Sequence, residues 1–148
     1  GPNVSAAGSV LAEAPDEVQI NQAHSNKGAS SLINWGIDSK KVKTPMTTVD
    51  SILASRASDA AGGELPHVFA MKVDVEGYEG YVMRGSRQLL KKPPCVLIME
   101  VNTKWLRDAG TPGSEVFDAL RAAGYSDVPP SIFEGMFTGT YFHRDFDR

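Results

Sequence analysis

Near its middle the chain reads KVDVEGYE, at residues 72–79. The residues from 67 to 75 are largely apolar in their first half, which predicts a strand covered by helices on both faces. Gly77 breaks this strand, and residues 78–90 follow as a helix with Tyr81, Val82 and Leu89 on its apolar side. The stretch therefore predicts a buried strand that ends in acidic residues at the mouth of an α/β sheet.

Four segments are predicted ahead of this strand. They are a short helix within residues 3–16, a strand over 17–23, a polar loop over 24–43 with a solvated lysine turn at 40–43, and a helix that begins at 47–53. A threonine can cap the last helix, and Asp50 lies in its first turn, where the helix dipole favours a negative charge. Residues 55–66 are small and glycine-rich, which predicts a surface loop.

Three further segments are predicted after it. They are a second apolar strand over 95–101, a helix capped by Ser114 and closed by Gly124, and a β-hairpin or returning antiparallel strand at 138–143. Strands that alternate with helices are typical of a parallel sheet covered on both faces, so the predicted fold class is α/β.

Composition limits the functions that the chain can have. Its 148 residues, 41% of them hydrophobic, fit one domain, and a formal charge of −3 argues against nucleic acid as a partner. Its single cysteine, Cys95, excludes an internal disulfide and predicts a buried core thiol, which is compatible with a cytoplasmic origin. No apolar run approaches the roughly 18 residues of a membrane span, so no membrane partner is expected.

Acidic residues follow both central strands. Asp74, Glu76 and Glu79 follow the first, and Glu100 follows the second, at the sheet edge where ligands of α/β proteins bind. Such carboxylates can bind sugar hydroxyls or the amino group of a cofactor tail, or act as a general base if burial raises the pKa. The alternative is that Asp74 caps the following helix and that Glu79 is exposed in its first turn.

A metal-free site is favoured over a metal site. Asp74, Glu76 and Glu100 could form a carboxylate-only Mg²⁺ site, but the three histidines lack metal-ligand spacing. His24 follows a predicted strand end and is the better histidine candidate for ligand contact. The sequence contains no nucleophile elbow or P-loop, and no glycine-rich dinucleotide loop follows a predicted strand.

The ordered segments resemble the FkbM-type S-adenosylmethionine-dependent methyltransferases. They read TTVDSIL at 47–53, MKVDVEGYE at 71–79, VMRG at 82–85 and VLIMEV at 96–101, with Gly124-Tyr125 and Tyr141-Phe142 later. The resemblance covers about residues 17–148 and is most specific at KVDVEGYE. It implies a Rossmann-like methyltransferase fold and methyl transfer from S-adenosylmethionine to oxygen, often in a sugar or other small hydroxylated acceptor.

The resemblance also implies roles for individual residues. Asp74 would lie near the methyl donor and the acceptor, Glu76 and Glu79 would shape the acceptor side, and Glu100 joins them as a candidate catalytic residue. The residues expected to border the adenine pocket are Ala23, His24 and Ser25.

The family's glycine-rich loop and the acidic residue that holds the ribose have no counterpart in this sequence. We therefore expect residues 3–148 to be a partial Rossmann-like methyltransferase domain without its N-terminal strands, with residues 1–2 left by removal of a tag. The chain is then the C-terminal portion of a methyltransferase or, alternatively, a non-catalytic interaction or scaffold module. Loss of central strands would expose an apolar sheet edge, which predicts self-association.

Overall fold

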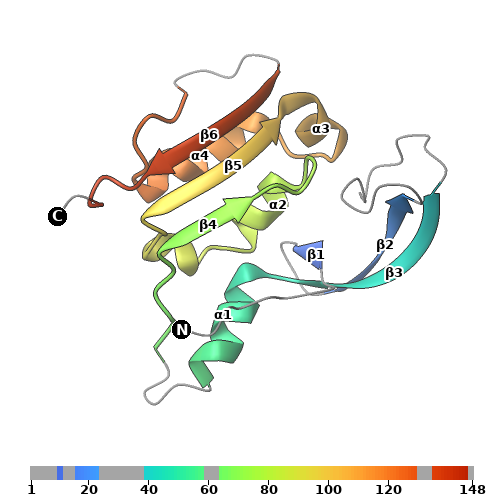
Figure 1. The fold of residues 1–148 in the computed structure, drawn as a ribbon, viewed down its shortest axis with the longest axis horizontal. Helices are drawn as coiled ribbons and strands as arrows, with labels where there is room; N and C mark the ends of the chain where they lie inside the picture. The colour runs from blue at the N-terminus through green and yellow to red at the C-terminus, as the bar shows by residue number, and fades with distance from the viewer. Residues whose placement is uncertain (1–9, 12–15, 24–38, 59–63, 130–134, 147–148) are drawn as a thin grey trace.

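The computed structural model describes residues 10–11, 16–23, 39–58, 64–129 and 135–146 (Figure 1). Its strands and helices form two mixed three-stranded sheets, β1-β3-β2 and β4-β5-β6, with helices α1 to α4, so the predicted α/β class is confirmed. The elements are β1 (Val10–Leu11), β2 (Asp16–Ala23), β3 (Ser39–Thr47), α1 (Val49–Ser58), β4 (Ala70–Val73), α2 (Glu79–Arg84), the 3₁₀-helix η2 (Leu89–Lys91), β5 (Val96–Asn102), α3 (Thr103–Asp108), α4 (Gly113–Ala123) and β6 (Met136–Phe142).

The first sheet corrects two sequence predictions. Residues 10–11, predicted as helix, form β1 and pair in parallel with β3. The predicted loop at 40–43 lies inside β3, which pairs antiparallel with the correctly predicted β2. Exposed Lys41 and Lys43 alternate with half-buried Val42 and buried Thr44, the two-residue period of a strand. Lys40, Lys41 and Lys43 are exposed as expected, but they lie in a strand rather than in a turn.

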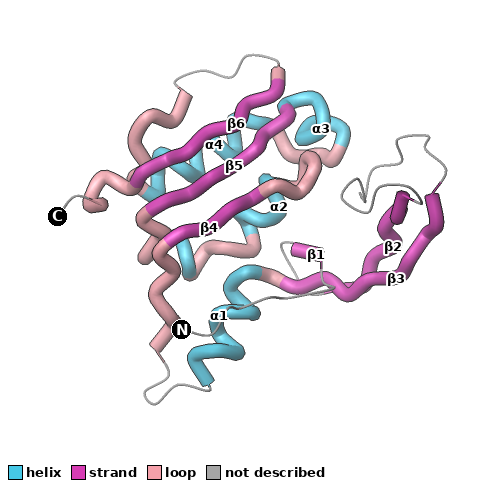
Figure 2. Tube along the Cα trace, in the orientation of Figure 1, coloured by secondary structure: helices cyan, strands magenta, loops and turns pink. Residues whose placement is uncertain are grey.

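The second sheet is parallel between β4 and β5 and antiparallel between β5 and β6. The returning antiparallel strand is thus confirmed. In Figure 2, α2 and α4 lie behind this sheet, and no described helix lies in front of it. Leu97 and Met99 of β5 are buried, whereas Ile98 between them is 38% exposed. In the described part of the chain, therefore, the prediction of helices on both faces is wrong.

The strand β4 is shorter than predicted and lies at the sheet edge. It spans four residues rather than nine, and β5 is its one strand neighbour among the described residues. Ala70 and Lys72 are exposed and Val73 is buried, so the strand presents one apolar face to the core instead of two. The apolar run at 67–71 is therefore only partly buried in the described structure.

The core lies between β4-β5-β6 and the helices behind it. Buried Val116, Phe117 and Leu120 of α4 belong to the same cluster as Leu97 and Met99 of β5. Burying side chains of this size contributes roughly 1.5–3 kcal/mol each, so α4 is a main source of stability. A bidentate ion pair further links α2 to α4, with Arg84 Nε 2.5 Å and Nη2 2.8 Å from the two carboxylate oxygens of Glu115.

Helix ends follow capping chemistry, with two differences from prediction. Thr48 caps α1 as predicted, because its Oγ1 accepts a hydrogen bond from Ser51 N at 2.9 Å. The helix continues through residues 55–58, which were predicted as loop. Pro112, not Ser114, precedes α4 as its N-cap, without a side-chain hydrogen bond. Gly124 ends α4 in the left-handed conformation (φ 94°), as predicted.

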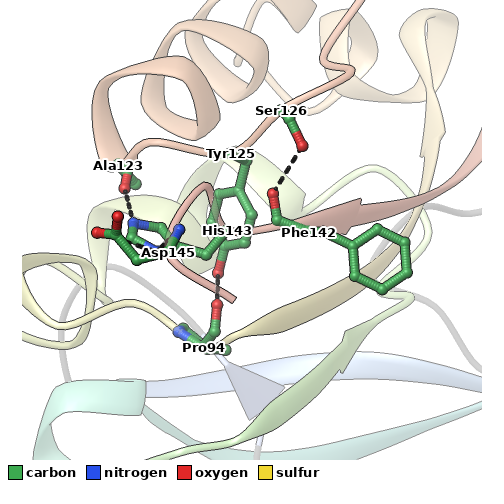
Figure 3. Close-up of polar contacts among 7 residues, drawn as sticks. All are labelled: Pro94, Ala123, Tyr125, Ser126, Phe142, His143 and Asp145. Carbon is green, nitrogen blue, oxygen red and sulfur yellow. Dashed lines mark hydrogen bonds and ion pairs between the residues drawn. The ribbon is translucent and has the colours of Figure 1, made fainter. Parts of the chain in front are cut away.

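The end of β6 is attached to the end of α4 by polar contacts (Figure 3). Tyr125 Oη donates to the Pro94 carbonyl at 2.8 Å, and burial raises the pKa of this phenol. Asp145 N donates to His143 Nδ1, which leaves His143 Nε2 to donate to the Ala123 carbonyl at 3.1 Å. Cys95 follows Pro94, and its carbonyl accepts a hydrogen bond from His143 N. Its side chain is half-buried, whereas a fully buried thiol was expected.

No helix in the described part of the chain is both long and apolar enough to cross a membrane.

Candidate functional site

Three of the predicted acidic residues lie near the carboxyl ends of β4 and β5, with Asp74 directly after β4 and Glu100 inside β5. The register pairs Val73 with Met99, so Asp74 and Glu100 follow side by side on adjacent parallel strands. Burial raises the pKa of Glu76, and the negative charges of Asp74 and Glu100 raise it further. The structure thus places three of the four carboxylates that were expected at this edge within electrostatic reach of one another.

The turn after β4 has an unusual backbone. Glu76 and Gly77 both have positive φ, 53° and 95°. A Cβ on Gly77 would lie 2.7–2.8 Å from Cβ and the carbonyl group of Trp105, so glycine alone fits between this turn and α3. A left-handed conformation costs a residue such as Glu76 roughly 1–2 kcal/mol. The surrounding structure holds Glu76 in this less favourable conformation, which directs its backbone away from the line of the strand.

Glu79 is the residue that holds this turn. Its side chain is 1% exposed, and its Oε1 accepts hydrogen bonds from Val75 N at 3.3 Å and Gly77 N at 3.2 Å. Burial raises the pKa of this carboxyl, against the opposing effect of the backbone N–H groups. The alternative that Glu79 is exposed in the first helical turn is therefore wrong, and Glu79 acts on the site through the backbone.

Asp74 pairs with Lys72, which was not among the residues expected at the site. Lys72 Nζ lies 2.9 Å from Asp74 Oδ2, and this hydrogen bond raises the pKa of the lysine. Tyr78 is the N-cap residue of α2, and no side chain caps that helix, so the alternative that Asp74 caps it is wrong. The sequence did carry a signal for this pair, because residues two apart in a strand, such as Lys72 and Asp74, lie on the same face.

The far side of the turn is formed by α3, a helix that was not expected from the sequence. Asn102 begins this helix by accepting hydrogen bonds from Lys104 N and Trp105 N at 3.1 and 3.2 Å. Asparagine directly after an apolar strand is a helix-start signal that would have located it. On the other side of the turn, Tyr78 stacks on Tyr81 with ring centroids 5.4 Å apart.

The predicted cofactor side is not assembled with these carboxylates. Ala23 ends β2 in the first sheet, where it pairs with Ser39, whereas Asp74 follows β4 in the second. Figure 1 shows these two strand ends apart. His24 and Ser25 lie outside the described residues. Within the ranges that the structure describes, no group of three or more His, Cys, Asp or Glu could hold a metal ion, so the Mg²⁺ alternative has no support there.

The arrangement suits two kinds of chemistry. Three carboxylates and one lysine leave an excess of negative charge, which attracts a cationic ligand. A carboxylate whose pKa is raised, as that of Glu76 is by burial and by the charges of Asp74 and Glu100, is a stronger base. The site therefore suits the binding of a cationic group and the acceptance of a proton.

Residues 3–126 match the model of the Methyltransferase FkbM domain. These residues include β4, β5 and all the candidate carboxylates, whereas β6 follows the matched range. Comparisons with the curated proteins and with the solved structures give no significant match.

Proposed function

This chain belongs to the FkbM methyltransferase family, and we propose that it is an S-adenosylmethionine-dependent O-methyltransferase of small hydroxylated or sugar-like acceptors. The observation that carries the proposal is the group formed by Asp74 and Glu76, which follow β4, and by Glu100 on the adjacent strand β5. Family membership supports methyl transfer, and this group supports the cofactor and the kind of acceptor.

The charges of the site fit the proposed cofactor. When bound, S-adenosylmethionine supplies a methyl carbon activated by a sulfonium, and the carbon–sulfur bond breaks as the methyl leaves. Asp74, Glu76 and Glu100 would attract this cationic group, because Lys72 balances only one of their charges. We propose that Asp74 lies near the donor and the acceptor.

Three residues of the chain would then have separate roles at the acceptor. Glu76 accepts the proton that the acceptor hydroxyl loses as its oxygen forms the new bond. Asp74, oriented by Lys72, accepts a hydrogen bond from the acceptor and fixes its position. Glu79 keeps the turn in place through Val75 N and Gly77 N, so it is a positioning residue.

Two measurements on the chain test this proposal. Calorimetry should detect binding of S-adenosylmethionine, and a labelled methyl group should appear on members of a panel of sugars and small alcohols. Glu76→Gln should lower turnover roughly 100-fold or more, the usual scale of general-base catalysis, and Asp74→Asn should lower it with the fold intact. Asp118→Asn, on the exposed surface of α4, is the control that should keep full turnover.

Two results would count against it. No calorimetric binding of the methyl donor would support the scaffold alternative instead. Normal turnover in both Glu76→Gln and Asp74→Asn would remove this carboxylate group from the mechanism.

We also propose that the chain self-associates through the open side of the second sheet. The outer edge of β4 has no partner strand among the described residues. On the other two strands, Ile98 of β5 and Phe142 of β6 are 38% and 42% exposed on the face that no described helix covers. Unpaired edges and exposed apolar side chains favour association.

A further inference from the structure

A cavity of about 500 Å³ lies at the opposite end of β4 from the carboxylates. It opens to solvent and is lined by Leu53 of α1, by residues 64–67 ahead of β4 and by residues of η2 and its flanks. None of its lining residues belongs to the candidate methyl-transfer site. Its size is typical of sites for small organic ligands.

The floor of the cavity is apolar and already formed. Leu53 of α1 and Leu89 of η2 are both buried, and Leu65, 36% exposed, forms a wall. Asp50 fixes the two helices against each other, because its carboxylate accepts hydrogen bonds from Gln88 N at 2.8 Å and Leu89 N at 3.0 Å. A ligand would therefore find its apolar surface prepared, with little structure left to order on binding.

The rim of the cavity is polar, with an excess of positive charge. Glu64 and Lys92 are paired at 2.8 Å across the mouth and are both largely exposed. Lys91 Nζ donates to Gln88 Oε1 at 2.8 Å, and among the described residues no carboxylate balances its charge. The rim can therefore exchange a neutral amide partner for an anionic one without breaking an ion pair.

We propose that this cavity binds a small amphipathic anion, with its apolar body on Leu53 and Leu89 and its carboxylate-type head group on Lys91. A cationic ligand would meet the uncompensated charge of Lys91 at the rim and be repelled, because Glu64 already balances Lys92. A wholly apolar ligand would make no ion pair with Lys91 and would gain affinity only from its contacts with the apolar floor. The proposal does not depend on methyl transfer, since the two sites share no residue.

Three matched probes, octanoate, octylamine and octanol, test this proposal in NMR titrations of the ¹⁵N-labelled chain. Octanoate should shift amides in 64–67 and 88–92 and leave the turn at 74–77 unchanged. It should bind at least about tenfold more tightly than octylamine or octanol. Lys91→Glu should weaken octanoate about tenfold or more, whereas Lys104→Glu, an exposed change on α3, should not.

A second variant tests the cavity itself. Leu65→Trp places a larger side chain in a half-open wall and should abolish the octanoate shifts, while a dispersed spectrum shows that the chain is folded. Equal binding of octanoate and octylamine, or unchanged octanoate binding in Lys91→Glu, would overturn the proposed head-group site. Shifts centred on Ile98 and Phe142 would overturn the cavity as the site.

Discussion

At the scale of single residues, environment gives two neighbouring glutamates different properties. Glu76 lies near Asp74 and Glu100, and both burial and these charges raise its pKa. Glu79 is buried on the other side of the turn, where its Oε1 accepts two backbone hydrogen bonds and its Oε2 has no partner in the described structure. One is therefore the candidate base, and the other fixes the base's backbone.

The buried carboxyl of Glu79 should make stability depend on pH. Burial raises its pKa above the usual 4.5, so the folded chain binds this proton more tightly than the unfolded chain. The stability that it contributes is present below pH 4.5 and is lost as pH rises through the folded pKa. Relative to wild type, Glu79→Gln should therefore gain in free energy of unfolding above pH 4.5. Urea unfolding at several pH values measures this, and a pH-independent difference would contradict it.

Gly77 should be the least replaceable glycine of the site. In Gly77→Ala the new Cβ would meet Trp105 backbone atoms at 2.8 Å and would require a positive φ, so we expect a loss of about 2 kcal/mol or more. Gly110→Ala is the matched control, because its φ is also positive but its nearest atom is Tyr81 Oη at 3.5 Å. Its loss should be about 1 kcal/mol. Equal losses of unfolding free energy in Gly77→Ala and Gly110→Ala would contradict this, because they would show that Trp105 moves to make room for the new Cβ.

At the scale of elements, the sequence predicts those helices and strands whose position depends on local residue patterns. The strands β2 and β5 and the helix α4 have clear periodicity, and the acidic residues at the end of β4 were located from motif and topology. The prediction of one helix over 78–90 was wrong because Gly85 ends α2, and Asp50, 38 residues before Gln88, starts η2. The buried position of Glu79 likewise depends on tertiary packing, which no local pattern contains.

The link between α1 and η2 provides a test at this scale. Asp50→Ala removes the acceptor of Gln88 N and Leu89 N, and loss of a capping side chain costs roughly 1–2 kcal/mol. We expect that loss in urea unfolding, together with faster hydrogen exchange at these two amides. Asp118→Ala, on the outer surface of α4, should change neither. Unchanged exchange at both amides in Asp50→Ala would contradict the capping role.

At the scale of the whole molecule, one face of β4-β5-β6 is covered by α2 and α4 and the other is open in the described structure (Figure 2). Ile98 lies near the centre of that open face, opposite Thr140 in the register. If copies associate there, Ile98→Lys should shift sedimentation toward the monomer at high protein concentration, because a buried charge opposes association. Ala122→Lys, on the exposed surface of α4, is the matched control and should leave sedimentation unchanged.

The last strand has a consequence for how the chain is made. β6 supplies buried Tyr141 and pairs along the whole of β5, yet it follows the residues that match the family. During synthesis β5 therefore leaves the ribosome well before its antiparallel neighbour, with one edge unpaired and its apolar face incompletely covered. A product terminated between Ser126 and Met136 would keep the methyltransferase motifs and still be a target for chaperones and proteases.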